Sequence, residues 1–148
     1  YDFETGELLW DATGLGRNQI PAPVHQGDLV YVMSGFIAPN LMAIRLGGQG
    51  DLTDTGVLMN FDAMTGAVHY RQRLPGPSNF KASPVAVNGR LYLSSEEGRV
   101  FVLKMGPAFE LLATNTLEDA VFIATPAVVD GAIILRSQDG LYRIGRAE

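Results

Sequence analysis

Residues 84–95 read Pro-Val-Ala-Val-Asn-Gly-Arg-Leu-Tyr-Leu-Ser-Ser, in which a polar turn separates two apolar runs. An Asn-Gly pair between β-branched and aromatic residues is a strong short-range signal for a tight β-hairpin. The same pattern recurs without a gap at 23–34 and 126–137, each time with proline first and serine eleven residues later. Three copies of one hairpin predict a repeat architecture.

A second motif, Asp-x-x-Thr-Gly-x-x-x-aromatic, occurs at residues 2–10 and again at 62–70. Its glycine supplies a backbone conformation that β-branched residues avoid, so we expect the Thr-Gly pair to turn the chain. Together with the apolar runs at 100–103 and 141–144, the two motifs predict units in which successive strands form an antiparallel meander.

Several expected strands are apolar almost without interruption, such as residues 29–33 and 132–135. A strand with one solvated face would alternate apolar and polar residues, whereas a continuous run fits a sheet that is covered on both faces. Small sheets stacked face to face around an axis provide this burial and leave only short edges. The sequence thus favours radially stacked β-sheets.

Composition and charge exclude several classes of function. The net charge is −5 and the pI is near 4.9, so there is no basic surface for nucleic acid. No stretch reaches the roughly 18 consecutive apolar residues of a membrane-spanning helix. The chain has no cysteine, which excludes disulfides, thiolate metal sites and cysteine nucleophiles.

From Tyr1 to about Ile144, these motifs resemble the repeats of pyrroloquinoline-quinone-type β-propellers. The resemblance implies an all-β propeller with quinoprotein-like, four-stranded antiparallel blades. At some 40 residues per blade, the chain supplies about three to four blades, and we expect it to be part of a larger ring of seven or eight. Residues 1–148 would form a single partial propeller with repeat units at approximately 1–19, 20–55, 56–80 (partial), 81–120 and 121–148.

The resemblance also implies a structural role for the Thr-Gly motif, which docks neighbouring blades in this family. The motif's aromatic side chain would lie between the blades, where a large ring buries well. After Leu103 the motif degrades, so regular docking is not expected there. The residues carried over are Asp2, Thr5, Gly6 and Trp10 for one dock and Asp62, Thr65, Gly66 and Tyr70 for the other.

The repeat spacing is irregular at one place. Pro84 and Pro126 are 42 residues apart, about one blade, whereas Pro23 and Pro84 are 61 apart, about one and a half. Two successive segments, 41–46 and 57–61, each resemble the third strand of a blade, with no Pro-to-Ser unit between them. We therefore hypothesise that roughly twenty residues of an intervening blade are absent near 54–56.

Catalytic chemistry finds little support in the sequence. By resemblance, quinoprotein dehydrogenases hold their cofactor over a tryptophan and under a vicinal disulfide, with calcium nearby. This chain has no cysteine, and its single tryptophan, Trp10, is assigned to a dock. We therefore assign no catalytic, cofactor-binding or metal-binding residue and expect no cofactor.

Other candidate groups have simpler interpretations. The acidic loop 51–56 lacks the spacing of a calcium loop, and the Gly-rich stretches 14–16 and 47–50 complete no phosphate-binding pattern. Glu96 and Glu97 are interpreted as a polar hairpin turn rather than an acid–base pair. His25, expected in a turn, and His69, expected in a strand, are interpreted as ordinary surface or interblade residues. We expect Phe36, Phe80 and Phe122 to be packing rather than contact residues.

The expected function is that of a non-enzymatic propeller module, a scaffold for binding or assembly in the bacterial cell envelope. By fold analogy, the nearest comparison is the periplasmic lipoprotein propeller that assists outer-membrane protein assembly. A periplasmic or extracellular location follows from the resemblance alone. Expected partners are proteins or the rest of its own propeller, with a homo-oligomer if the chain is complete as given. The alternative is a fragment of a quinoprotein dehydrogenase, or of another propeller-containing enzyme, whose catalytic residues lie outside this segment.

Overall fold

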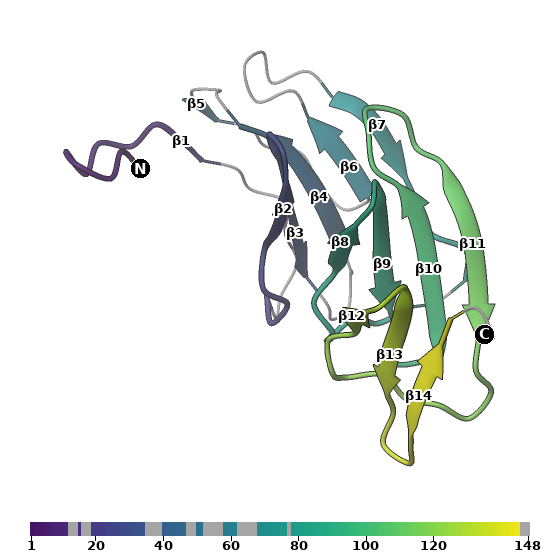
Figure 1. Cartoon of the computed structure of the whole chain (residues 1–148). Coiled ribbons are helices and arrows are strands. Elements are labelled where there is room, and N and C mark those ends of the chain that lie inside the picture. The colour runs from purple at the N-terminus through teal and green to yellow at the C-terminus, as the bar shows by residue number, and fades with distance from the viewer. Residues whose placement is uncertain are drawn as a thin grey trace.

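The computed structural model describes residues 1–11, 15, 19–34, 40–46, 50–51, 58–61, 68–76 and 78–145. All regular secondary structure in these residues is β-strand, arranged in radiating sheets (Figure 1). The strands are β1 (Trp10–Asp11), β2 (Val24–Gln26), β3 (Leu29–Ser34), β4 (Asn40–Arg45), β5 (Gly50–Asp51), β6 (Leu58–Phe61), β7 (Val68–Gln72), β8 (Val85–Val87), β9 (Arg90–Ser94), β10 (Arg99–Lys104), β11 (Leu111–Thr116), β12 (Ala127–Val129), β13 (Ala132–Arg136) and β14 (Leu141–Ile144).

The middle sheet is a regular four-stranded meander in the order β11-β10-β9-β8, with every pair antiparallel. Its first hairpin turns at Asn88 and Gly89, which have φ angles of 50° and 71°. Positive φ at both central residues is the geometry that matches the twist of the flanking strands, and it is why Asn-Gly predicts the turn. The expected blade is confirmed here.

The third sheet, β12-β13-β14, repeats the first three strands of this meander. Its first hairpin turns at Asp130 and Gly131, with φ of 48° and 72°. The serine at the end of the Pro-to-Ser unit, Ser137, then organises the next turn, because its Oγ accepts hydrogen bonds from the N–H groups of Asp139 and Gly140 at 3.1 and 3.0 Å. The motif's serine is thus a local cap that shapes the second hairpin.

The first sheet departs from the expected blade. It has five strands in the order β2-β3-β4-β6-β7, and β4 pairs with β6 in parallel. The pairing places Met42 opposite Met59 and Ala43 opposite Asn60. Both segments resemble the third strand of a blade in sequence, and two copies of the same strand run in the same direction, so they pair in parallel. The expectation of purely antiparallel blades is therefore wrong for this sheet, at the place where the repeat spacing is irregular.

The core lies between the sheets. One buried cluster joins the first sheet to the middle sheet, and a second joins the middle sheet to the third. Phe101 faces the first cluster and Val100 the second, so β10 is buried on both sides. This two-sided cover is why β10 is continuously apolar. The members of the clusters are Leu29, Tyr31, Met33, Leu41, Ala43, Phe80, Leu91, Leu93, Phe101 and Leu103 in the first, and Val100, Ala120, Phe122 and Leu135 in the second.

The N-terminal segment lies apart from these sheets, at the opposite end of the molecule from β14 (Figure 1). It touches the rest of the described chain through β1, which pairs in parallel with β5 over two residues. Large apolar side chains are exposed along it, with Phe3 fully exposed and Leu8 at 51%. The segment therefore carries unburied apolar surface.

Candidate functional site

The first Thr-Gly motif folds into a self-contained turn. Oδ1 of Asp2 accepts hydrogen bonds from the N–H of Thr5 at 2.7 Å and from its hydroxyl at 2.8 Å. The N–H of Asp2 donates to the carbonyl of Glu7 at 2.7 Å, and Gly6 closes the turn with φ of 71°. The N–H of Thr5, followed by its hydroxyl, lowers the pKa of the Asp2 carboxyl. Asp, Thr and Gly are thus required together by the turn itself.

The aromatic residues of the two motifs have different surroundings. Trp10 is half-buried in β1, whereas Tyr70 in β7 packs against the cluster between the first and middle sheets. The ring of Tyr70 meets that of Phe109 edge to face, with centroids 5.7 Å apart. Asp62, Thr65 and Gly66 lie outside the described residues.

Two hydrogen bonds to hydroxyl groups, here called the hydroxyl ladder, link the segments that precede β2, β8 and β12. The N–H of Ala22 donates to Oγ of Ser83 at 2.7 Å. The N–H of Ser83 in turn donates to Oγ1 of Thr125 at 3.1 Å. Each of these residues directly precedes the proline of a Pro-to-Ser unit, so the equivalent position in one sheet bonds to that in the next. The ladder therefore joins each sheet to the next.

Beside the ladder lies a shallow open hollow of about 510 Å³, largely apolar, between β2 and β8. Nothing in its lining forms a catalytic pair. The lining residues are Ala22, Pro23, Val24, His25, Ser83, Pro84, Val85, Ala86 and Thr125.

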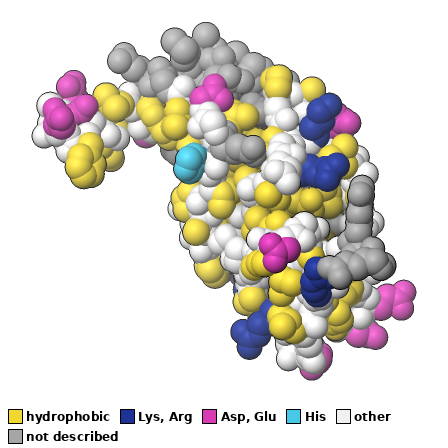
Figure 2. All heavy atoms as spheres, in the orientation of Figure 1, with side chains coloured by type: hydrophobic (Ala, Val, Ile, Leu, Met, Phe, Trp, Pro, Cys, Tyr) yellow, Lys and Arg dark blue, Asp and Glu magenta, His cyan; other side chains and the backbone are white. Residues whose placement is uncertain are grey.

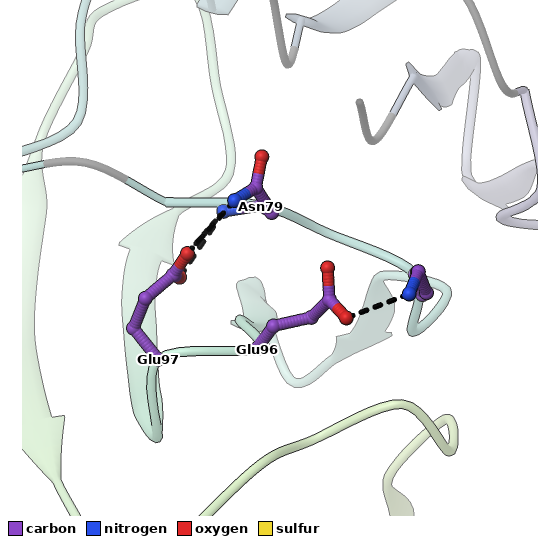
Figure 3. Close-up of polar contacts among 4 residues, drawn as sticks. Asn79, Glu96 and Glu97 are labelled. Atoms are coloured by element: carbon purple, nitrogen blue, oxygen red, sulfur yellow. Dashed lines mark hydrogen bonds and ion pairs between the residues drawn. The ribbon is translucent and has the colours of Figure 1, made fainter. Parts of the chain in front are cut away.

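The two adjacent glutamates serve separate structural contacts (Figure 3). Oε1 of Glu96 forms an ion pair with Nζ of Lys81 at 2.7 Å. The Glu97 carboxylate accepts hydrogen bonds from the backbone N–H and the side-chain amide of Asn79, each with an N–O distance near 3.0 Å. Both glutamates lie in the turn after β9, as predicted, and tie it to the segment before β8. They do not converge on a common point as an acid–base pair would.

The structure places the remaining candidates as follows. His25 lies in β2 and is exposed, so its predicted position in a turn is wrong. His69 is in β7, as expected. Phe80 and Phe122 are buried at 4% and 0%, which confirms packing rather than surface contact. In the acidic loop, Asp51 lies in β5, and the rest of the loop is outside the described residues. Phe36 is also outside them. Of the two Gly-rich stretches, only Leu15 and Gly50 are described.

Among the described residues, no three His, Asp or Glu side chains gather where they could hold a metal ion. In the same part of the chain, no helix is long and apolar enough to cross a membrane. Ser94 and Ser95 are fully buried, and their hydroxyls have no hydrogen-bond partner among the described residues. A serine nucleophile needs a base within hydrogen-bond reach, so these serines lack that arrangement.

Replacing Tyr31 by phenylalanine is expected to leave stability unchanged or raise it by about 1 kcal/mol. The Tyr31 hydroxyl is buried and has no hydrogen-bond partner in the described part of the chain. Burial, with the nearby Tyr70 and Asp28, raises its pKa to about 12. The pKa of Tyr31 is therefore higher in the folded state than in the unfolded state, so the protonated phenol contributes to the free energy of unfolding at neutral pH. This contribution is lost as the pH rises from about 10 through 12. Urea unfolding of both proteins at pH 8 and pH 11 measures this.

The control for this experiment is Tyr142→Phe, because Tyr142 is only half-buried. The alkaline loss of stability should be smaller in Tyr31→Phe than in the parent or in the control. A drop of 2 kcal/mol or more at pH 8 would instead show that the hydroxyl has a stabilising partner.

Comparison with known proteins identifies the repeat. The family described as "Outer membrane protein assembly factor BamB" matches residues 1–106. The crystal structure of BamB from Moraxella catarrhalis matches 88% of this chain with a TM-score of 0.57 and 19% identity. This match covers 34% of that protein, so the chain spans about a third of its length. The computationally designed Ika4 protein matches with a TM-score of 0.46 and 14% identity, over 95% of this chain and 99% of that one. No curated protein matches the sequence.

The matched residues include both Thr-Gly motifs and two of the three Pro-to-Ser units. The structural likeness supports a propeller fold for the described sheets. The chain belongs to the family of the outer membrane protein assembly factor BamB, with the pyrroloquinoline-quinone-like β-propeller repeat that its sequence predicts.

Proposed function

We propose that the chain is a non-enzymatic propeller module, which binds proteins as an assembly scaffold in the periplasm of a bacterial cell envelope. The observation that carries this proposal is the family match over residues 1–106. The related protein's name describes an assembly factor. Such a role requires surfaces that bind other proteins and does not require catalytic side chains. Propellers suit it because their loops are held on a rigid frame.

The side-chain contacts are consistent with this function. Glu96 and Glu97, the adjacent carboxylates, are both engaged in structural contacts. The hollow between β2 and β8 is lined by prolines, small apolar residues, His25 and two hydroxyls. The hydroxyls accept backbone hydrogen bonds from neighbouring segments. These groups hold the frame together.

The two Thr-Gly motifs are proposed to dock neighbouring blades, with Trp10 and Tyr70 as the interblade aromatic residues. The contact between Tyr70 and Phe109 supports this role for the second motif, because Phe109 follows the third strand of the neighbouring sheet. For the first motif, the hydrogen bonds of Asp2, Thr5 and Gly6 preorganise the turn that such docking needs.

Capture from a bacterial envelope extract tests the scaffold proposal. The immobilised chain is expected to enrich proteins of outer-membrane protein assembly, identified by mass spectrometry. The matched control is the same chain immobilised after heat denaturation, so proteins that bind both samples recognise unfolded chain. Failure to enrich any assembly protein over this control would contradict the scaffold proposal.

A thermal-shift measurement with pyrroloquinoline quinone and calcium separates this function from a quinoprotein enzyme. Specific binding to the native state must raise the melting temperature. We expect no shift at millimolar ligand. A concentration-dependent rise would overturn the non-enzymatic assignment.

A further inference from the structure

The turn between β8 and β9 carries the one Asn-Gly pair of the sequence, Asn88-Gly89. An asparagine before a glycine is chemically labile, because the backbone nitrogen of the glycine can attack the side-chain amide carbon and glycine has no side chain to obstruct the attack. Asn88 and Gly89 are both exposed, so water reaches the turn. A Cβ built on Gly89 would have no atom within 4 Å. The tip of this hairpin therefore has room for a reaction between the two residues.

This reaction exchanges an amide for an acid and consumes only water. The Gly89 nitrogen loses its proton and bonds to Cγ of Asn88, while the bond from Cγ to Nδ2 breaks and ammonia leaves. Water then opens the cyclic imide. Cleavage between the nitrogen and Cγ gives aspartate, and cleavage between the nitrogen and the main-chain carbonyl carbon gives isoaspartate, whose main chain is one carbon atom longer. Nothing is oxidised or reduced.

The closed hairpin holds the reacting atoms apart. Asn88 and Gly89 have φ angles of 50° and 71°, as in a type I′ turn. In that turn the ψ angle of the first central residue is about 30°, which directs the Gly89 nitrogen away from the Asn88 side chain. The carbonyl of Gly89 also accepts a hydrogen bond from the N–H of Met105 at 2.9 Å, which ties the turn to the end of β10. The hairpin must therefore open locally before the imide can form.

The third Pro-to-Ser unit shows how the fold accommodates an aspartate at this position. Its equivalent turn is Asp130-Gly131, with φ angles of 48° and 72°. These angles nearly equal those of Asn88 and Gly89, so the aspartate product keeps the geometry of the hairpin. The longer main chain of isoaspartate would instead shift β8 against β9, which pair through only three residues of β8.

The aspartate product would also lie in basic surroundings. Arg90 follows the turn and pairs with Lys104 at the end of β10. Figure 2 shows Lys and Arg side chains near this end of β10. Lys104 is already ion-paired with Glu110 at 2.8 Å. A carboxylate at position 88 would thus be close to the guanidinium of Arg90, which favours its charged form.

We propose that Asn88-Gly89 is the site at which this protein deamidates spontaneously. The reaction occurs when the β8–β9 hairpin opens, and the aspartate product leaves the blade intact. Because Val85 and Ala86 of β8 line the hollow beside β2, the modification records openings of the strand that borders this hollow. The isoaspartate product would weaken that strand's pairing.

Incubation of the purified chain at pH 8, with and without urea, tests the proposal. Tandem mass spectrometry of the digested chain should show conversion of Asn88 before that of any other asparagine. Ion exchange should show the net charge change from −5 to −6. Urea should accelerate conversion at Asn88, because the unfolded chain has no hairpin to open. The matched control is Asn88→Gly, since Gly-Gly also forms this turn but has no amide to lose, so the acidic species should not accumulate.

Asn88→Asp supplies the aspartate product directly and should melt at the temperature of the parent. The isoaspartate form, separated by ion exchange, should melt at a lower temperature. Earlier conversion of another asparagine would overturn the proposal, as would equal accumulation of the acidic species in Asn88→Gly. Equal rates at Asn88 with and without urea would contradict the need for opening. A lower melting temperature for Asn88→Asp would contradict the accommodation of the product.

Discussion

Replacement of Phe122 by alanine is expected to lower the free energy of unfolding by about 3–5 kcal/mol. Phe122 is fully buried between the middle and third sheets, with Val100, Ala120 and Leu135 around it. It also forms a β-bridge with Ser137, so its ring anchors the segment between β11 and β12 to the next blade. Truncation would leave a cavity at the contact of two sheets. Urea unfolding followed by circular dichroism measures the loss.

Phe3→Ala is the matched control, since the Phe3 side chain is fully exposed. The same change there should alter the free energy of unfolding by less than about 0.5 kcal/mol. Similar losses for the two variants would mean that the third sheet does not pack on the middle sheet through Phe122.

The Gly98→Ala variant should be the second most disruptive change. Gly98 has φ of 71°, and an added Cβ would overlap the carbonyl oxygen of Leu117 and lie 2.7 Å from that of Ala120. These are backbone atoms, so the chain must shift to admit a methyl group. The N–H of Leu117 also donates to the carbonyl of Gly98 at 2.9 Å, which holds the two segments together.

Gly89→Ala isolates the contribution of the close contact. Gly89 has the same φ of 71° but nothing within 4 Å of the added Cβ. The left-handed conformation alone costs an alanine about 1–2 kcal/mol. Gly98→Ala should cost about 1–3 kcal/mol more than that. Equal melting temperatures for the two variants would exclude a tight contact at Gly98.

The structure shows how far the sequence predicts the candidate site. The interpretation of Glu96 and Glu97 as part of a polar turn is confirmed, and so is that of Phe80 and Phe122 as packing residues. The hydroxyl ladder was missed, although Ser83 and Thr125 precede the motif prolines. The sequence feature that could have predicted this ladder is a hydroxyl residue directly before the proline in two of the Pro-to-Ser units. Sequence spacing alone does not show which unit that hydroxyl faces.

The local structure of this protein follows directly from its amino-acid sequence. Asn-Gly and Asp-Gly pairs dictate tight hairpins because of their backbone preferences, and continuous apolar runs require sheets covered on both sides. The parallel pairing of β4 with β6 became evident only in the tertiary structure. The reason is that any strand edge with free N–H and C=O groups can pair with another, so the partner of a strand depends on which edges the whole fold brings together.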